Sequence, residues 1–264
     1  MSTMDSVTEY GEFDEKFQET FELFKRNIES DEEVGASFAV YKDGKPIIDL
    51  YGGFQDRDKK ISWNKDTLVN VHSTSKGIVA MVVAKLIDNG DLELDKRVCD
   101  YWPEFSENGK NDIRVKTLLS HQAGLYGWRE PLDETDFYNW DYVCELLAKQ
   151  KPFHEPNEEI CYHPKTIGFL VGELIKRITK KSVGKNLHEL LSKPLNAKCF
   201  IGTPETYHNN IAELISSESL RKAFSNPENV DNYMVTAFLN PANRTKTANT
   251  CLLYTSPSPR DQAK

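Results

Sequence analysis

The sequence predicts an α+β fold in which a helix covers a small antiparallel sheet and a mostly helical region follows. Two observations predict it: a helical pattern next to a hairpin signal near the start of the chain, and only helical patterns after that. The 264 residues allow one large domain or two small ones, and 39 % hydrophobic residues suffice for a packed core.

The first element is an amphipathic helix. Its apolar residues recur three or four positions apart at Tyr10, Phe13, Phe17, Phe21, Phe24 and Ile28. The next element is a hairpin, because the apolar runs ASFAVY and PIIDLYGG flank Asp43-Gly44, and both turn residues tolerate positive φ angles.

A longer helix begins near Ser73 and ends at Asn89-Gly90, where Gly90 suits a C-terminal cap. It is apolar on nearly every side, which predicts a buried helix. Ser73 stands at the N-cap position, with Thr74 and Ser75 as alternatives. Shorter helices are predicted over Asp141–Gln150, Lys165–Lys180 and Val183–Leu191, whereas 99–140 and 196–250 show little periodicity.

Charge and composition exclude several functions. The net charge is −8 and the basic residues are scattered, so neither nucleic acid nor a membrane surface is an expected partner. The apolar run from Ile78 is interrupted at Lys85, and no targeting segment precedes the helix. Five cysteines without a C-x-x-C pair and six histidines without H-x-x-x-H spacing predict a cytoplasmic protein with no metal and no cofactor.

Serine and lysine in S-x-x-K spacing remain as the candidate chemistry. About 1.5 occurrences are expected by chance, and the chain has four: Ser62/Lys65, Ser73/Lys76, Ser182/Lys185 and Ser219/Lys222. Only Ser73/Lys76 opens a helix expected to be buried, where both side chains lie on one face and the helix N-terminus favours an oxyanion. A Ser N-cap beside a solvent-directed Lys explains the same pattern equally well.

A set of motifs decides between these two interpretations. Between Thr67 and Trp128 the chain carries the S-x-x-K helix start, a G-D-L-x-L-D turn, Y-W-P-E-F at 101–105 and L-L-S-H-Q-A-G-L at 118–125. In this order they resemble the beta-lactamase-related serine hydrolases, which include class C beta-lactamases, penicillin-binding proteins and family VIII esterases. The resemblance covers roughly residues 10 to 240 and implies a beta-lactamase/transpeptidase-like fold, an antiparallel sheet flanked by helices plus an all-helical region.

The resemblance also implies the catalytic residues Ser73, Lys76 and Tyr162. Tyr162 opens Y-H-P, which is similar to the Y-H-A of the esterase-like branch; the other interpretation is a packed aromatic at a helix entry. Pro164 lacks the side-chain amide that binds substrate in true beta-lactamases, which argues against strong beta-lactam specificity. His121 and His163 are expected to be structural.

The function implied for the intact gene product is a serine hydrolase that acts on a small ester or amide through a Ser73 acyl-enzyme, with Lys76 and Tyr162 sharing the role of base. The alternative is a non-catalytic relative that self-associates or binds a partner, which leaves a homo-oligomer open. The family's third motif, K-T-G or H-x-G, is absent from the sequence. We therefore expect this chain to be inactive and poorly soluble, with a hairpin that keeps only its internal pairing and an unpaired edge at Ser37–Tyr41.

Residues Cys251 to Asp261, CLLYTSPSPRD, match the translation of a transposase adaptor used in sequencing libraries. A disordered Ser/Pro-rich end is the alternative. We expect 1–250 to be a single domain, with helix and hairpin over 10–55, a helical region over 66–200 and a partial remainder over 201–250. Residues 251–264 are expected to be adaptor-derived and disordered, and sequencing the transcript past Thr250 tests this.

Overall fold

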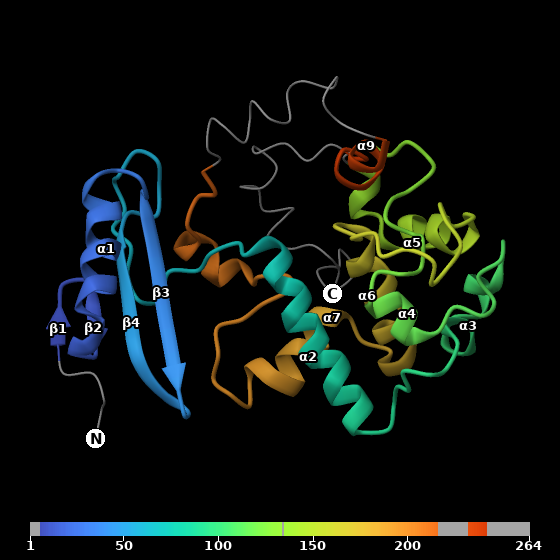
Figure 1. The fold of residues 1–264 in the computed structure, drawn as a ribbon, viewed down its shortest axis with the longest axis horizontal. Coiled ribbons are helices and arrows are strands. Elements are labelled where there is room, and N and C mark those ends of the chain that lie inside the picture. The colour runs from blue at the N-terminus through green and yellow to red at the C-terminus, as the bar shows by residue number, and fades with distance from the viewer. Residues whose placement is uncertain (1–5, 134, 216–231, 242–264) are drawn as a thin grey trace. The chain divides into compact units, whose positions relative to one another are not determined.

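The computed structural model describes residues 6–133, 135–215 and 232–241 (Figure 1). The described residues form two compact units. One contains the residues up to Asn70 together with Glu205–Ile215, and the other contains Val71–Pro204 with 232–241. The tail from Cys251 onward lies outside the described residues.

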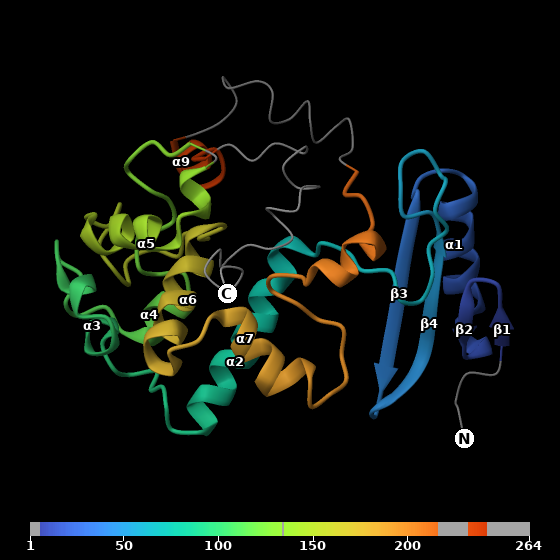
Figure 2. The same ribbon diagram turned by 180° about the vertical axis from the view of Figure 1, so that it is seen from behind.

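The first unit is built on an antiparallel sheet, whose strands β1 to β4 are labelled in Figure 2. Its strands are β1 (Ser6–Thr8), β2 (Gly11–Phe13), β3 (Gly35–Lys42) and β4 (Lys45–Gly53), in the order β1-β2-β4-β3. The predicted hairpin is confirmed: Lys42 pairs with Lys45, and Asp43 and Gly44 take φ angles of 51° and 72° between them. These positive angles match the twist of the flanking strands.

The first helix begins later than predicted. α1 spans Gln18–Glu29, whereas Tyr10 and Phe13 lie in or beside β2. Gly11 takes a φ of 107°, and Asp14 accepts a hydrogen bond from the backbone N–H of Lys16, so the chain turns before the helix starts. Phe13 still packs against α1, with its ring stacked on Phe21 at 4.6 Å between centroids. The regular spacing of apolar residues from Tyr10 to Ile28 therefore reflects a core shared by β2 and α1 and not one continuous helix.

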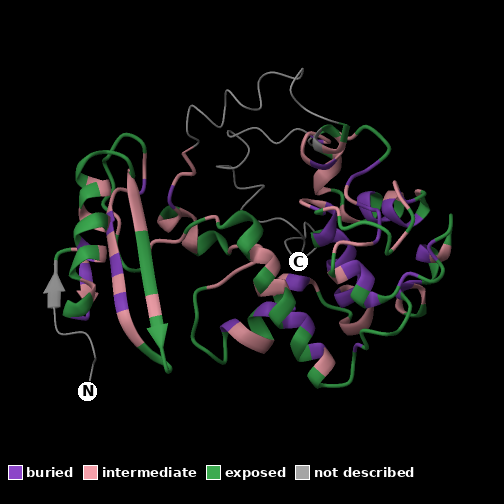
Figure 3. Cartoon of the chain, viewed as in Figure 1, coloured by how far each residue is buried: buried purple, intermediate pink, exposed green. Residues whose placement is uncertain are grey.

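The expectation that the hairpin keeps only its internal pairing is wrong, because β2 also pairs with β4 along Gly11–Phe13. The prediction of an open edge at Ser37–Tyr41 is confirmed within the described residues, where β3 pairs with β4 alone. Figure 3 shows that the two strands differ in burial: β4 carries buried residues, whereas β3 is mostly exposed. Phe38 and Tyr41 are 42 % and 65 % exposed. Such an apolar edge is a place where another strand can pair.

The second unit is helical, and its helices follow the predicted ranges closely where the pattern was periodic. They are α2 (Ser75–Asp88), α3 (Val98–Tyr101), α4 (Val115–Leu119), α5 (Trp140–Lys149), α6 (Thr166–Thr179), α7 (Val183–Leu187, continued by a π-helical turn at His188–Ser192) and α9 (Asn232–Phe238). The 3-10 turns Pro103–Ser106 and Asp136–Tyr138 lie between them.

The helix α2 is not buried on all sides, contrary to the prediction. Val82, Val83 and Leu86 are buried, whereas Gly77, Ala80, Met81 and Ala84 are exposed in the described structure. Small apolar residues gave the sequence its uniform hydrophobicity, but hydrophobicity alone does not say which side meets a neighbour. The predicted end is confirmed, because Gly90 follows the helix with a φ of 80°.

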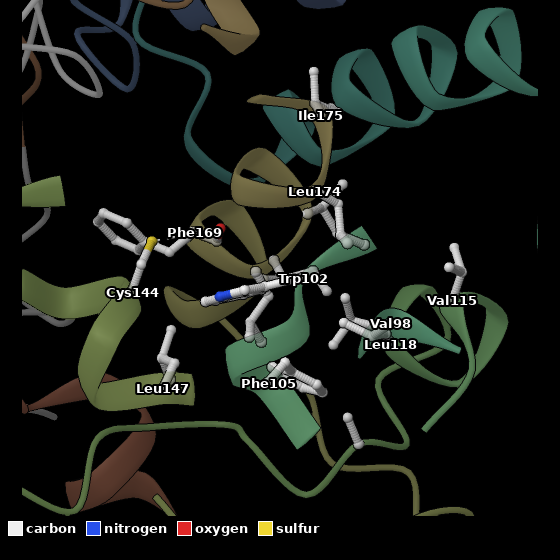
Figure 4. Packing of buried hydrophobic residues seen from close by; sticks show 14 of the residues in the cluster. Val98, Trp102, Phe105, Val115, Leu118, Cys144, Leu147, Phe169, Leu174 and Ile175 are labelled. Carbon is white, nitrogen blue, oxygen red and sulfur yellow. Dashed lines mark hydrogen bonds between the residues drawn. The ribbon is translucent and has the colours of Figure 1, made fainter. Parts of the chain in front are cut away.

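The core of the helical unit holds the motifs that carry the family resemblance (Figure 4). Trp102 and Phe105 come from Y-W-P-E-F, and their ring centroids are 5.3 Å apart. Leu118 and Leu125 are the outer residues of the L-L-S-H-Q-A-G-L segment, and both are buried. Phe169 and Leu174 bring the long helix α6 into the same cluster.

One charged residue is fully buried in this unit. The Lys110 ammonium donates hydrogen bonds to the backbone oxygens of Glu107, at 2.6 Å, and of Gln150, at 2.5 Å. Gln150 is the C-terminal cap of α5, where a cation interacts favourably with the helix dipole. Burial lowers the pKa of Lys110 from 10.5 to about 8.

This lowered pKa predicts how stability depends on pH. Between pH 8 and 10.5 the unfolded chain binds more protons at Lys110 than the folded chain, so this residue makes the free energy of unfolding rise with pH in that window. Lys110→Met removes this contribution. The free energy of unfolding of the variant therefore rises less between pH 8 and 10 than that of the parent. Urea unfolding at several pH values measures it, with exposed Lys116→Met as control. Parallel curves for parent and Lys110→Met contradict the prediction.

Within the described residues, no helix combines the length and the apolar character needed to cross a membrane.

Candidate active site

Ser73 lies in a 3-10 turn, His72–Thr74, that leads directly into α2. His72 takes a φ of 45°, which is uncommon for a residue with a side chain. The turn exposes Ser73 and places it one residue before the N-cap of α2, which is Thr74 rather than Ser73, the first choice from the sequence. The Ser73 hydroxyl therefore stands just before the N-terminus of a helix.

Three side chains meet at the Ser73 oxygen. The Tyr162 hydroxyl donates a hydrogen bond to Ser73 Oγ at 2.8 Å, and Lys76 Nζ donates another at 3.1 Å. Lys76 Nζ also lies 5.0 Å from the centre of the Tyr162 ring. The structure thus brings together all three of the catalytic residues expected from the sequence.

The surroundings of Tyr162 favour its deprotonated form. Burial of the ring raises the pKa of Tyr162, but hydrogen bonding with Ser73 and Lys76 and the positive charge of Lys76 outweigh burial, so the pKa falls below 10. Lys76 is held by a second hydrogen bond, from Nζ to the backbone oxygen of Pro164 at 2.8 Å. Pro164 thus contributes through its carbonyl, two residues before α6 begins at Thr166.

The other S-x-x-K pairs have different surroundings. Ser182 is the N-cap of α7, and its oxygen accepts a hydrogen bond from the backbone N–H of Lys185 at 3.2 Å. This is the structural role that spacing alone could not exclude for Ser73. Ser62 lies in the sheet unit outside any helix, and Ser219 lies outside the described residues.

His121 and His163 are hydrogen-bonded locally, as expected from the sequence, but they lie against the site. His163 is fully buried, and its Nε2 accepts a hydrogen bond from the backbone N–H of Leu125 at 3.1 Å. Burial lowers the pKa of His163 to about 4, so the ring is neutral. The His121 ring packs against Tyr162, with 5.0 Å between centroids.

The helix α9 contributes contacts that the sequence did not predict. The Tyr233 hydroxyl donates a hydrogen bond to the backbone oxygen of Tyr162 at 2.7 Å, and the Phe238 ring lies 6.5 Å from the Tyr162 ring. Lys165, three residues after Tyr162, donates a hydrogen bond to the backbone oxygen of Pro241. The seven residues of α9 are too few to show a clear periodicity. The aromatic character of Tyr233 and Phe238 is the one feature of the sequence that could have suggested a contact with Tyr162.

Within the described parts of the chain, no group of three or more His, Cys, Asp or Glu residues lies close enough to hold a metal ion. Ser73, Lys76 and Tyr162 have the chemistry of a nucleophile and its base.

Sequence comparison places this chain in a known family. The profile of the Beta-lactamase family matches residues 22–247. Among curated proteins, the esterase/beta-lactamase LipL of Mycobacterium tuberculosis is 32 % identical over 188 residues, which cover 70 % of this chain and 43 % of LipL. Protein flp of Staphylococcus aureus is 29 % identical over 167 residues, covering 61 % of this chain and 33 % of flp.

Solved structures agree with the sequence comparison. A family VIII carboxylesterase superposes with a TM-score of 0.81 at 35 % identity, covering 93 % of this chain and 63 % of that one. A penicillin-binding protein homologue from Caulobacter crescentus gives 0.80 at 33 % identity, covering 90 % and 62 %. The predicted fold class, beta-lactamase/transpeptidase-like α+β, is confirmed. This chain spans less than two thirds of these relatives' length, and within that span its sequence and its fold make it a member of the beta-lactamase family.

Proposed function

We propose that the chain carries the catalytic residues of a serine hydrolase that cleaves small esters or amides through an acyl-enzyme on Ser73. The observation that carries the proposal is the convergence of Tyr162 Oη and Lys76 Nζ on Ser73 Oγ, at 2.8 and 3.1 Å. Hydrogen-bond distance between a nucleophile and its base is what proton removal requires. The hydrolase-like character of the relatives supports the same class of reaction.

The reaction follows from these contacts. Tyr162, with its pKa lowered beside Lys76, accepts the Ser73 proton as Oγ attacks the substrate carbonyl. The backbone N–H of Ser73 stabilises the negative charge on the carbonyl oxygen. The same proton then passes to the leaving group, and water releases the acyl group from Ser73.

Esters are the preferred substrates under this proposal. Pro164 presents only its carbonyl near the site, and that oxygen is engaged by Lys76 at 2.8 Å. No side-chain amide stands at this position to bind the amide of a beta-lactam substrate. The resemblance of Tyr162-His163-Pro164 to the esterase-like branch supports the same preference.

Covalent labelling tests the proposal. A longer protein that contains this chain and spans the full length of its relatives is expected to react with a fluorophosphonate probe at Ser73, because Tyr162 and Lys76 activate that hydroxyl. Mass spectrometry of the labelled peptide identifies the site. Ser73→Ala is expected to abolish labelling, whereas Ser182→Ala, which changes the other serine at a helix start, leaves it intact.

Two outcomes contradict the proposal. Label on a serine other than Ser73 shows that the wrong nucleophile was assigned. A chain that melts cooperatively but remains unlabelled supports the alternative from the sequence, a non-catalytic relative that keeps the scaffold for binding.

A further inference from the structure

One residue, His121, binds the backbone on both sides of Tyr162. The backbone N–H of Cys161 donates a hydrogen bond to the backbone oxygen of His121 at 3.1 Å. The backbone N–H of His163 donates to His121 Nδ1 at 3.0 Å. His121 therefore holds the residues immediately before and after Tyr162, and its ring packs on the Tyr162 ring between them.

His121 is itself firmly placed. It follows α4, and its segment runs beside the chain that leads to Tyr162: Asn157 N–H donates to the Gln122 oxygen at 2.9 Å, and Phe153 N–H donates to the Gly124 oxygen at 2.7 Å. His121 takes a φ of 62°, a left-handed conformation that residues with side chains rarely adopt. A strained backbone is retained where the surroundings require that one geometry.

The protonation of the ring decides whether this contact exists. Because Nδ1 accepts the His163 N–H, the neutral tautomer of His121 carries its proton on Nε2. Burial lowers the pKa of His121, and the charge of Lys76 lowers it further. The titratable groups of the elements packed against His121 are Lys76 from α2 and Cys161, Tyr162 and His163 from the segment before α6.

We infer that His121 is a positioning residue for Tyr162: its backbone oxygen and its Nδ1 hold the Tyr162 segment so that the hydroxyl reaches Ser73. This inference rests on the proposed function. It assigns a role at the site to a histidine that neither donates to nor accepts from Ser73, Lys76 or Tyr162 in the described contacts. Protonation of Nδ1 replaces the acceptor by a donor, which breaks the hydrogen bond from His163.

Two substitutions separate positioning from general structure. Asn tolerates the left-handed conformation of His121, and its amide oxygen takes the place of Nδ1 as acceptor. Gly tolerates the same φ and keeps the backbone oxygen, but it removes the Nδ1 acceptor. Comparing His121→Asn with His121→Gly therefore tests the acceptor while the backbone conformation stays available. His188→Ala, which changes an exposed histidine after α7, is the control.

The readout is the second-order rate of fluorophosphonate labelling at Ser73, measured from pH 5 to 9. We expect His121→Gly to slow labelling about 10- to 100-fold, because small misplacement of a catalytic group has effects of this size. His121→Asn is expected to restore most of the rate. The parent rate falls in acid partly because His121 gains a proton, and His121→Asn lacks this part of the decrease.

The outcomes distinguish this inference from the proposed function. If the parent chain is labelled at Ser73 and His121→Gly reacts at the same rate, the positioning role is wrong while the nucleophile stands. If His121→Asn and His121→Gly are equally slow, and their labelling rates fall in acid as the parent rate does, the His121 ring is needed for packing and not as a hydrogen-bond acceptor. This outcome also overturns the inference. An unlabelled but folded parent overturns the proposed function itself.

Discussion

Lys76→Ala and Tyr162→Phe are each expected to reduce hydrolysis of a small p-nitrophenyl ester about 10³-fold, because each removes part of one shared base. Lys76 and Tyr162 both contact Ser73 Oγ. The mechanism requires both, because Lys76 lowers the pKa of Tyr162 and Tyr162 accepts the Ser73 proton. The double variant is expected to be little slower than either single variant, since residues that act as a unit lose activity non-additively.

The same experiment has an internal control. Lys185→Ala changes the lysine of the other helix-start S-x-x-K pair, and it is expected to leave the ester rate unchanged because Ser182 serves there as an N-cap. Near-normal rates in both single variants contradict the shared-base mechanism. Effects of Lys76→Ala and Tyr162→Phe that multiply in the double variant show that the two groups act independently.

The sequence predicted well the features that depend on near neighbours in the chain. The Asp43-Gly44 turn, the end of α2 at Gly90 and the range of α6 were all predicted from local signals. The proximity of Ser73 and Lys76 is of the same kind, because a spacing of three places both on one face of a helical turn. Each of these features involves only a few residues, so propensity and spacing suffice.

Features that depend on distant contacts were predicted poorly. The strand β2 looked like the first turn of a helix, because Tyr10 and Phe13 face the same core as α1. The exposed side of α2 looked buried, because small apolar residues do not reveal their neighbours. A pattern of hydrophobicity records that a residue is buried, or is apolar, but not which element lies opposite.

The candidate site shows both kinds of information. Tyr162 lies 89 positions from Ser73 in sequence, and only the resemblance to a family, not spacing, brought the two together. Tyr233 and the two-sided contact of His121 escaped prediction, because they act on the backbone around Tyr162 rather than through a motif of their own. The sequence located His121 within L-L-S-H-Q-A-G-L but could not say which groups its nitrogen and its carbonyl would meet.

The glycine of that motif gives the second large expected effect. Gly124 has a φ of 67°, and a Cβ added there lies 2.5 Å from the backbone oxygen of His154, which cannot move freely. Gly124→Ala therefore combines an unfavourable conformation with a clash against backbone, and we expect it to lower the free energy of unfolding by roughly 2–4 kcal/mol. For a chain of this size, that corresponds to a melting temperature lower by roughly 5–15 °C.

Gly168→Ala is the matched control, because Gly168 lies in α6, is exposed, and has open space where a Cβ would be. There alanine favours the helix, and we expect a gain of about 0.5 kcal/mol. Thermal unfolding followed by circular dichroism measures both variants. Gly124→Ala is also expected to slow Ser73 labelling at temperatures where it remains folded, since Gly124 lies between His121 and Leu125, whose N–H binds His163. Equal melting temperatures for the two variants, or normal labelling of a destabilised Gly124→Ala, contradict the view that this segment holds Tyr162 in place.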